Sequence, residues 1–230
     1  MTTRSPRAAR RPHQLTEHGD VRVDDYYWLR ERDNPEVRAY LDAENEYLRT
    51  ELSHTAALQD RLYDEIKSRI KQTDMSVPYR DGDYRYYRRY EDGHEYPIYC
   101  RQLADGVQDD GSEQIILDVN KVARGHDFCD VGSLRVSHDM NILSYAVDTI
   151  GRREYDLRFR HLETDKEFDD VVRAVTANMV WAADNRTVFY VRHDPTTLRA
   201  YRVLRHELGT DASKDVLVFE ERDETFSCAV

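Results

Sequence analysis

The sequence has few cysteines: three among 230 residues, Cys100, Cys129 and Cys228. Their odd number and wide spacing fit neither a disulfide framework nor the closely spaced ligand pairs of a zinc site. We therefore expect no structural metal and no cofactor, and we expect a reducing, cytoplasmic compartment.

Long apolar segments are also missing. A membrane-spanning helix needs about 20 consecutive apolar residues, and no such run occurs. Arg10 and Arg11 form a twin-arginine pair, but the apolar segment that an export signal requires does not follow them. These absences predict a protein without a membrane span or a secretory signal.

The sequence lacks the common catalytic motifs. No serine lies in the G-x-S-x-G turn of α/β-hydrolases; Ser133 follows Gly132, but Val131 and Arg135 stand where glycines are required, so a plain turn is expected there. Zinc-protease, dinucleotide-binding and P-loop signatures are absent as well. We therefore predict no catalytic, cofactor-binding or metal-binding residue in this chain. Four histidines are interpreted as solvated residues at turns or strand ends: His94, His126, His138 and His193.

Basic residues are fewer than acidic ones, 34 against 45, which gives a formal net charge of -11. Nucleic-acid binding requires basic patches, so nucleic acid is not expected as a partner. The charge favours cationic ligands, although acidic side chains also serve simply to keep a protein in solution.

The first third of the chain predicts a flexible arm followed by helices. Residues 1–20 show no periodicity and are expected to be flexible, and residues 21–76 to form an arm and a two-helix hairpin. Asn34 and Pro35 are suited to begin a helix. Apolar residues at three- and four-residue spacings predict helices over residues 35–52 and 56–72, joined as an antiparallel pair.

Residues 77–230 change to an alternating pattern typical of β-strands. The pattern recurs: residues 134–162 align with residues 179–208 at a shift of 45 that becomes 46 after one inserted residue. An earlier unit aligns at a shift of 59, placing Tyr86 on Tyr145 and Leu103 on Leu162. Repeats of this length with about four short strands predict about three blades of a β-propeller, with an elongated repeat array as the alternative.

Two aspartates, Asp139 and Asp184, occupy equivalent positions in the repeats. Aspartate side chains commonly accept hydrogen bonds from the backbone of their own turn, so we interpret both as turn-capping carboxylates rather than metal ligands.

Several segments together resemble the prolyl oligopeptidase family of serine peptidases, and oligopeptidase B within it. The segments that carry the resemblance are residues 24–30 (DDYYWLR), 34–37 (NPEV), 40–45 (YLDAEN), 95–101 (EYPIYCR), 144–148 (SYAVD) and 202–210 (RVLRHELGT). The resemblance implies a seven-bladed propeller beside an α/β-hydrolase domain that holds the catalytic triad and cleaves short peptides after Arg or Lys.

The expected fold class is therefore mainly β with an N-terminal helical hairpin, an incomplete propeller, and no hydrolase domain. The expected partners are short basic peptides in the context of the full enzyme, and a hydrolase domain in cis or in trans. An open ring leaves two sheet faces uncovered, which predicts a chain that is marginally stable or aggregates on its own. The alternatives are a free-standing module that binds peptides or proteins, and a non-functional truncated product.

Overall fold

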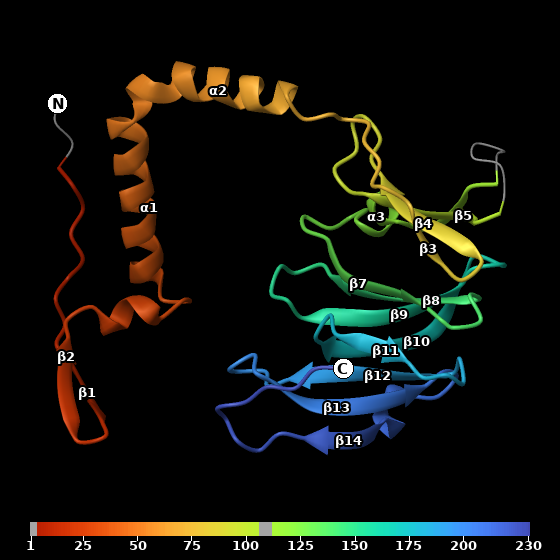
Figure 1. The fold of residues 1–230 in the computed structure, drawn as a ribbon. Helices are drawn as coiled ribbons and strands as arrows, with labels where there is room; N and C mark the ends of the chain where they lie inside the picture. The colour runs from red at the N-terminus through yellow and green to blue at the C-terminus, as the bar shows by residue number, and fades with distance from the viewer. Residues whose placement is uncertain (1–3, 106–111) are drawn as a thin grey trace. The chain divides into compact units, whose positions relative to one another are not determined.

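The computed structural model describes residues 4–105 and 112–230. Contacts divide the chain into two compact units, Met1–Lys71 and Gln72–Val230. Each is described by itself (Figure 1). No helix in the described part of the chain is long and apolar enough to cross a membrane.

The first unit begins with a β-hairpin. Strands β1 (His13–Glu17) and β2 (Asp20–Asp24) pair antiparallel through a turn at His18 and Gly19, both of which have positive φ angles. The structure thus differs from the flexible arm expected over residues 1–20, because residues 13–17 obtain their backbone hydrogen bonds from β2. The 3-10 helix η1 (Tyr27–Arg30) follows, and its buried Trp28 donates a hydrogen bond from the indole nitrogen to Ala9 O at 2.9 Å.

The two predicted helices are present. Helix α1 (Pro35–Glu51) is capped by Asn34, whose side chain accepts from the backbone N–H of Glu36, and helix α2 is Ala56–Ser68. The antiparallel pair is wrong: Figure 1 shows α1 and α2 meeting at a corner through the 3-10 turn η2 (Ser53–Thr55). This turn keeps a helical hydrogen bond from Thr55 N to Leu52 O, so the chain does not reverse direction.

The second unit contains three antiparallel four-stranded sheets, each in sequence order, as propeller blades are. Blade 1 is β3 (Tyr79–Asp81), β4 (Tyr84–Arg89), β5 (Ile98–Leu103) and β6 (Gln114–Asp118); a short helix, α3 (Val119–Val122), follows it. Blade 2 is β7 (Asp130–Val136), β8 (Ile142–Asp148), β9 (Tyr155–His161) and β10 (Lys166–Val175). Blade 3 is β11 (Met179–Trp181), β12 (Thr187–His193), β13 (Ala200–Glu207) and β14 (Val216–Glu220), with the 3-10 turn η3 (Ala212–Lys214) before β14.

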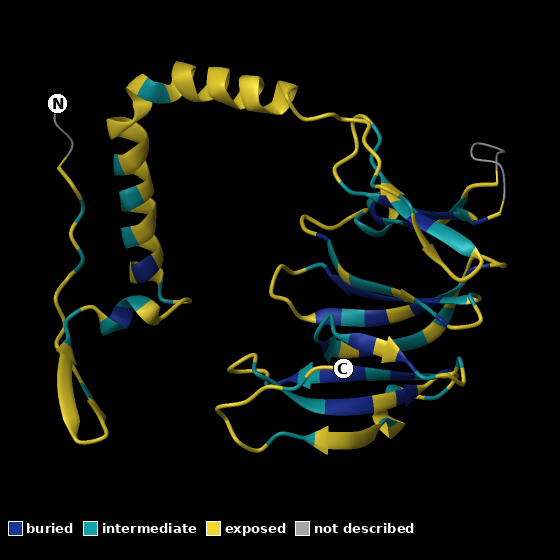
Figure 2. Ribbon diagram, viewed as in Figure 1, coloured by how far each residue is buried: buried dark blue, intermediate teal, exposed yellow. Residues whose placement is uncertain are grey.

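The core lies between successive blades rather than inside any one of them (Figure 2). Between blades 1 and 2, Tyr86 of β4 packs in one cluster with Leu143 and Tyr145 of β8. Between blades 2 and 3, Leu157 and Phe159 of β9 pack in a second cluster that includes residues of β12. Strand β8 contributes odd-numbered residues to the first cluster and Ala146 to the second. The prediction of three packed blades is confirmed.

Strand pairing confirms the alignment of the second and third repeats. Leu134 lies opposite Tyr145, and Met179 lies opposite Tyr190. Both pairs differ by the predicted shift of 45. On the next strand, Leu157 pairs with Ala146 and Val203 pairs with Val191, which agrees with the predicted shift of 46.

The alignment of the first repeat is wrong by one residue. Leu162 donates its backbone N–H to Asn141 O, and the equivalent bond in blade 1 runs from Ala104 to Asp83, a shift of 58 rather than 59. Ala104 is buried, whereas Leu103 is half exposed. A one-residue shift places each side chain on the opposite face of a strand. Tyrosines line both faces of blade 1. The positions of the tyrosines in the sequence therefore do not show which face of the blade is turned toward blade 2.

Gly132 is required because β7 lies close to Ala177 and Tyr155 at this position. A Cβ at Gly132 would lie 2.6 Å from both the Ala177 Cβ and the Tyr155 ring. We expect Gly132→Ala to lower the free energy of unfolding by about 1–3 kcal/mol, measured by urea denaturation. Adding Ala177→Gly removes one of the two clashes and should restore part of the loss; a double variant no more stable than Gly132→Ala would contradict this explanation.

Candidate functional site

Ser133, the serine nearest in sequence to a nucleophile motif, lies within strand β7 and not in the turn that we expected. The strand contains a register shift between Val131 and Ser133, which allows Gly132 to interrupt the ladder without a turn. In the part of the chain that the structure describes, no hydrogen bond joins Ser133 to a histidine. Ser133 therefore has no geometry for nucleophilic catalysis.

The three cysteines are poor nucleophiles. Cys100 and Cys129 are buried, and all three thiols are free. Burial, reinforced by the nearby Glu113 carboxylate, raises the pKa of Cys100 to about 12. Burial also raises the pKa of Cys129 and of Cys228 above the usual value. Because the thiolate is the reactive form, none of the three is activated at neutral pH.

The predicted solvated histidines divide into two groups. His94, His126 and His138 are exposed, as expected. His193 is buried, which corrects the prediction: it is the last residue of β12 and pairs with Ala200 in the sheet, so its ring lies within the blade.

His206 is the polar residue of greatest interest that the sequence did not indicate. It is fully buried on β13, and its ring stacks on Phe159 of blade 2 at a centroid distance of 5.6 Å. Its Nδ1 lies 2.7 Å from Asp215 Oδ1, and its Nε2 lies 3.4 Å from Asp170 Oδ2. Tyr190 donates its hydroxyl hydrogen to the other oxygen of Asp215 at 2.8 Å. The network joins β10 of blade 2 to blade 3.

A histidine beside an aspartate also occurs in catalytic triads, but this arrangement is structural. In a triad, one ring nitrogen faces the carboxylate and the other faces the nucleophile. Here both ring nitrogens face carboxylates, and the ring has no exposed surface for a substrate. Buried polar groups of this kind hold packed elements in one arrangement when all their partners are present.

We predict that His206→Asn lowers the free energy of unfolding by about 2–4 kcal/mol. The substitution removes the imidazole that contacts the carboxylates of Asp215 and Asp170 in the interior. Urea denaturation followed by tryptophan fluorescence measures this loss. The control is His138→Asn at an exposed position, which should change stability by less than about 0.5 kcal/mol. Equal effects of the two substitutions would show that the network contributes nothing.

The interpretation of Asp139 and Asp184 as turn-capping carboxylates is confirmed. Asp184 accepts hydrogen bonds from the backbone N–H groups of Arg186 and Thr187 at 3.0 and 2.8 Å, and from the Thr187 hydroxyl. These bonds lower the pKa of Asp184 to about 2. Burial opposes ionisation of Asp139, but hydrogen bonds from Ser137 and Asn141 outweigh it, and the pKa lies below its usual value.

The lowered pKa of Asp184 predicts a pH dependence of stability. A carboxylate with a lower pKa in the folded state stabilises the protein above its unfolded pKa of about 3.9. This contribution is lost as pH falls through about 2. We expect Asp184→Asn to lower the melting temperature at pH 6, and the difference from the wild type to shrink between about pH 4 and pH 2. A difference that stays constant over this range would contradict the assignment.

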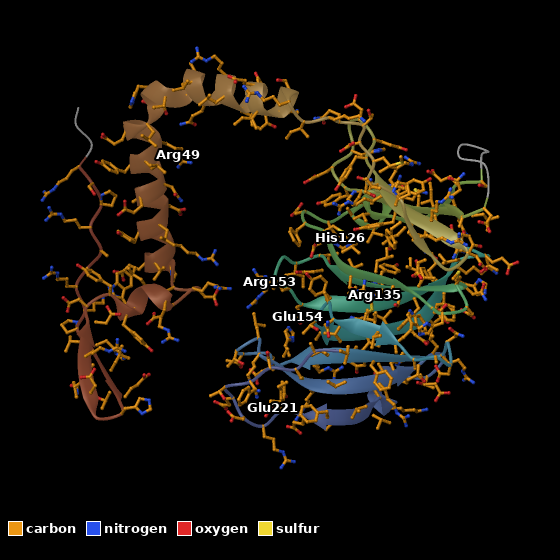
Figure 3. The ribbon with its side chains drawn as sticks, in the orientation of Figure 1. Arg49, His126, Arg135, Arg153, Glu154 and Glu221 are labelled. Carbon is orange, nitrogen blue, oxygen red and sulfur yellow. The ribbon has the colours of Figure 1, made fainter. Side chains whose placement is uncertain are left out.

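The candidate functional surface is the edge of the three sheets at which the chain passes from one blade to the next. We call it the connection face. It consists of the loops at residues 90–97, 119–129, 149–154, 176–178 and 194–199, and of residues 221–226. Figure 3 shows His126, Arg153, Glu154 and Glu221 along this edge.

Buried or partly buried aspartates fix the loops of the connection face. The Asp148 side chain is buried and accepts from the backbone N–H groups of Ile150, Gly151 and Arg153 at 2.7–2.9 Å. Asp194 accepts from the N–H groups of two residues in its own loop. The loops therefore present charged side chains of both signs from a fixed backbone.

Comparison with known proteins identifies the family. The model of the prolyl oligopeptidase N-terminal β-propeller domain matches residues 6–230. The chain belongs to the prolyl oligopeptidase family. The predicted family and fold class are therefore confirmed. The described residues form propeller blades and the preceding helical segment, and they contain no hydrolase domain.

Individual relatives agree with this family. The chain is 44% identical to dipeptidyl aminopeptidase BI of Pseudoxanthomonas mexicana, over 96% of this chain and 33% of that protein. It is 35% identical to protease 2 of Moraxella lacunata, over 96% of this chain and 33% of that protein. The structure of oligopeptidase B from Leishmania major matches with a TM-score of 0.90 and 34% identity, over 97% of this chain and 34% of that chain. The chain thus spans about a third of the length of these relatives.

Proposed function

We propose that the chain is the non-catalytic N-terminal part of an oligopeptidase that cleaves short peptides after Arg or Lys, and that its propeller restricts access to the active site. The observation that carries the proposal is the match to oligopeptidase B over 97% of this chain, with a TM-score of 0.90. The family resemblance implies the cleavage preference. The net charge of -11 is consistent with attraction of basic peptides.

Exposed apolar residues support a catalytic domain as the partner, in cis or in trans. Within the first unit, apolar side chains of α1, α2 and the turn after α2 are between 43% and 61% exposed: Leu41, Leu48, Leu52, Leu58, Leu62, Ile66 and Ile70. Apolar surface of this extent marks an interaction site in a soluble protein. In the second unit, the mixed charges of the connection face suit a domain interface that opens and closes, because such interfaces are more polar than permanent ones.

The alternative is a free-standing module that binds peptides or proteins without catalysis. The connection face is compatible with this role as well, since it offers fixed loops with charges of both signs. The two hypotheses differ in whether a peptidase activity accompanies the chain. We also propose a cytoplasmic location, which the three free thiols support.

The test is to isolate the chain with an affinity tag from its native cells and to measure the peptidase activity that accompanies it. We expect hydrolysis of N-blocked fluorogenic peptides that end in Arg or Lys, and little hydrolysis of casein, because a closed propeller admits only short chains. The control is the chain made alone in a heterologous host, which should be inactive because it holds no catalytic triad in its described residues.

Each other result points to a different function. Hydrolysis of peptides with a free N-terminal dipeptide, but not of N-blocked peptides, would replace endopeptidase activity by dipeptidyl aminopeptidase activity. Equal rates on casein and short peptides would overturn the restriction of access. Isolation of the chain without any peptidase activity would favour the interaction module.

A further inference from the structure

A cleft lies between blades 1 and 2. It has a volume of about 460 Å³, within the range of sites for small ligands. All its lining residues belong to the second unit, between Ser76 and Arg135. It lies between the sheet of blade 1, in which β3, β4, β5 and β6 all contribute lining residues, and β7 of blade 2. None of its lining residues belongs to the connection face.

One wall of the cleft is aromatic. Tyr79 lies opposite Tyr86 in the sheet, and the two rings stack at a centroid distance of 5.8 Å. Tyr99 of β5 lies opposite Arg88 of β4, so both side chains are on the same face of blade 1. The facing wall is β7 of blade 2, which contributes Val131 and Leu134. A side chain of aromatic or branched aliphatic type fits between walls of this kind.

The charged side chains that line the cleft are those of Arg88 and Arg135, and no aspartate or glutamate is among its lining residues. The Glu113 carboxylate accepts from the hydroxyl of Tyr87, a lining residue, and forms an ion pair with Arg89. Figure 3 labels Arg135 on β7. Within residues 4–105 and 112–230, neither guanidinium takes part in an ion pair, although acidic residues outnumber basic ones in the chain. Arg135 Nη1 donates to the backbone oxygen of Leu134 at 2.9 Å, which leaves its other N–H groups available. Two guanidiniums that lack a carboxylate partner in an otherwise acidic protein favour an anionic ligand, and a carboxylate matches their planar donor geometry.

The tyrosines add hydroxyl groups to the cleft without adding charge. Tyrosine has an ordinary pKa of about 10, so these hydroxyl groups are neutral at physiological pH. Further polar groups among the lining residues are the hydroxyls of Ser76, Ser133 and Tyr87 and the thiol of Cys100.

We propose that this cleft binds the C-terminal residue of a short peptide, with the free carboxylate between Arg88 and Arg135 and an apolar or aromatic last side chain against Tyr79, Tyr86 and Tyr99. The choice of a peptide rests on the proposed function, since the substrates and products of an oligopeptidase are short peptides with free carboxylates. The site would hold a peptide by its C-terminal end.

The test is calorimetric titration of the tagged protein isolated from native cells with N-acetyl-Ala-Phe. This ligand has a blocked N-terminus and no Arg or Lys, so neither proposed peptidase activity cleaves it. We expect the free acid to bind at least about tenfold more tightly than the C-terminal amide, because the amide lacks the charge that the two arginines recognise. Binding that is equal for acid and amide would overturn the proposal.

Variants locate the binding. Arg88→Gln and Arg135→Gln should each weaken binding of the free acid by about tenfold. The matched control is Arg173→Gln, an exposed arginine on β10 of blade 2 that lies outside both the cleft and the connection face, which should leave binding unchanged. If a glutamine variant does not fold, as judged by its thermal transition, Arg88→Lys and Arg135→Lys replace it and should weaken binding less than tenfold because they keep the charge. Unchanged binding in all of these cleft variants would overturn the assignment.

Inorganic phosphate and acetate distinguish a peptide site from a general anion site. Acetate at millimolar concentration should compete weakly, and phosphate should not displace the peptide at equal concentration. Tight phosphate binding without binding of N-acetyl-Ala-Phe would overturn the proposal in favour of a simple oxyanion site. Because no step here requires hydrolysis, a failure of this binding test is separate from a failure of the proposed peptidase function.

Discussion

The constraint on which the second unit depends is that each blade has two apolar faces and only its neighbours to cover them. Strand β8 shows this directly, since Leu143, Tyr145 and Val147 pack against blade 1 while Ala146 packs against blade 3. Neither cluster could form from one sheet alone. A change in one blade is therefore expected to affect the packing of the next, as in other repeat proteins.

Hydrogen bonds between blades fix how each blade is aligned with the next, which apolar packing alone does not determine. The buried Arg101 of blade 1 donates from Nη1 to the backbone oxygen of Met140 at 2.6 Å, and Trp181 of blade 3 donates to the backbone oxygen of Arg135 at 3.3 Å. The His206 network adds a third tie, between blades 2 and 3. Apolar contacts tolerate sliding, whereas hydrogen bonds in the interior lose most of their energy when their geometry changes. These bonds thus set the angle and distance between blades.

The meander order of the strands also decides which loops lie at which edge of the blades. In a meander, alternate turns lie at opposite edges, so the turns held by Asp139 and Asp184 are at one edge, and the loops held by Asp148 and Asp194 are at the other. All four aspartates act on their own loop, which explains why short loops with many charged residues keep a fixed backbone. The blade faces are then free for packing, and the cleft between blades 1 and 2 is lined by two arginines that form no ion pair within the described residues.

The sequence by itself determined the two long helices, the repeating strands of residues 77–230 and the family, but not the β1–β2 hairpin. Periodicity and caps located α1 and α2, since Asn34 and the spacing of leucines act within a few residues. The recurring turn aspartates identified the repeat for the same reason. Only the tertiary structure decided which face of blade 1 is inward, that His193 and His206 are buried, and that α1 and α2 meet at a corner. The corner depends on the geometry of the short turn η2, which the apolar spacing of the helices does not record. The burial of the histidines depends on residues far apart in the chain: His206 meets Asp170 across 36 positions, and no local pattern records that contact.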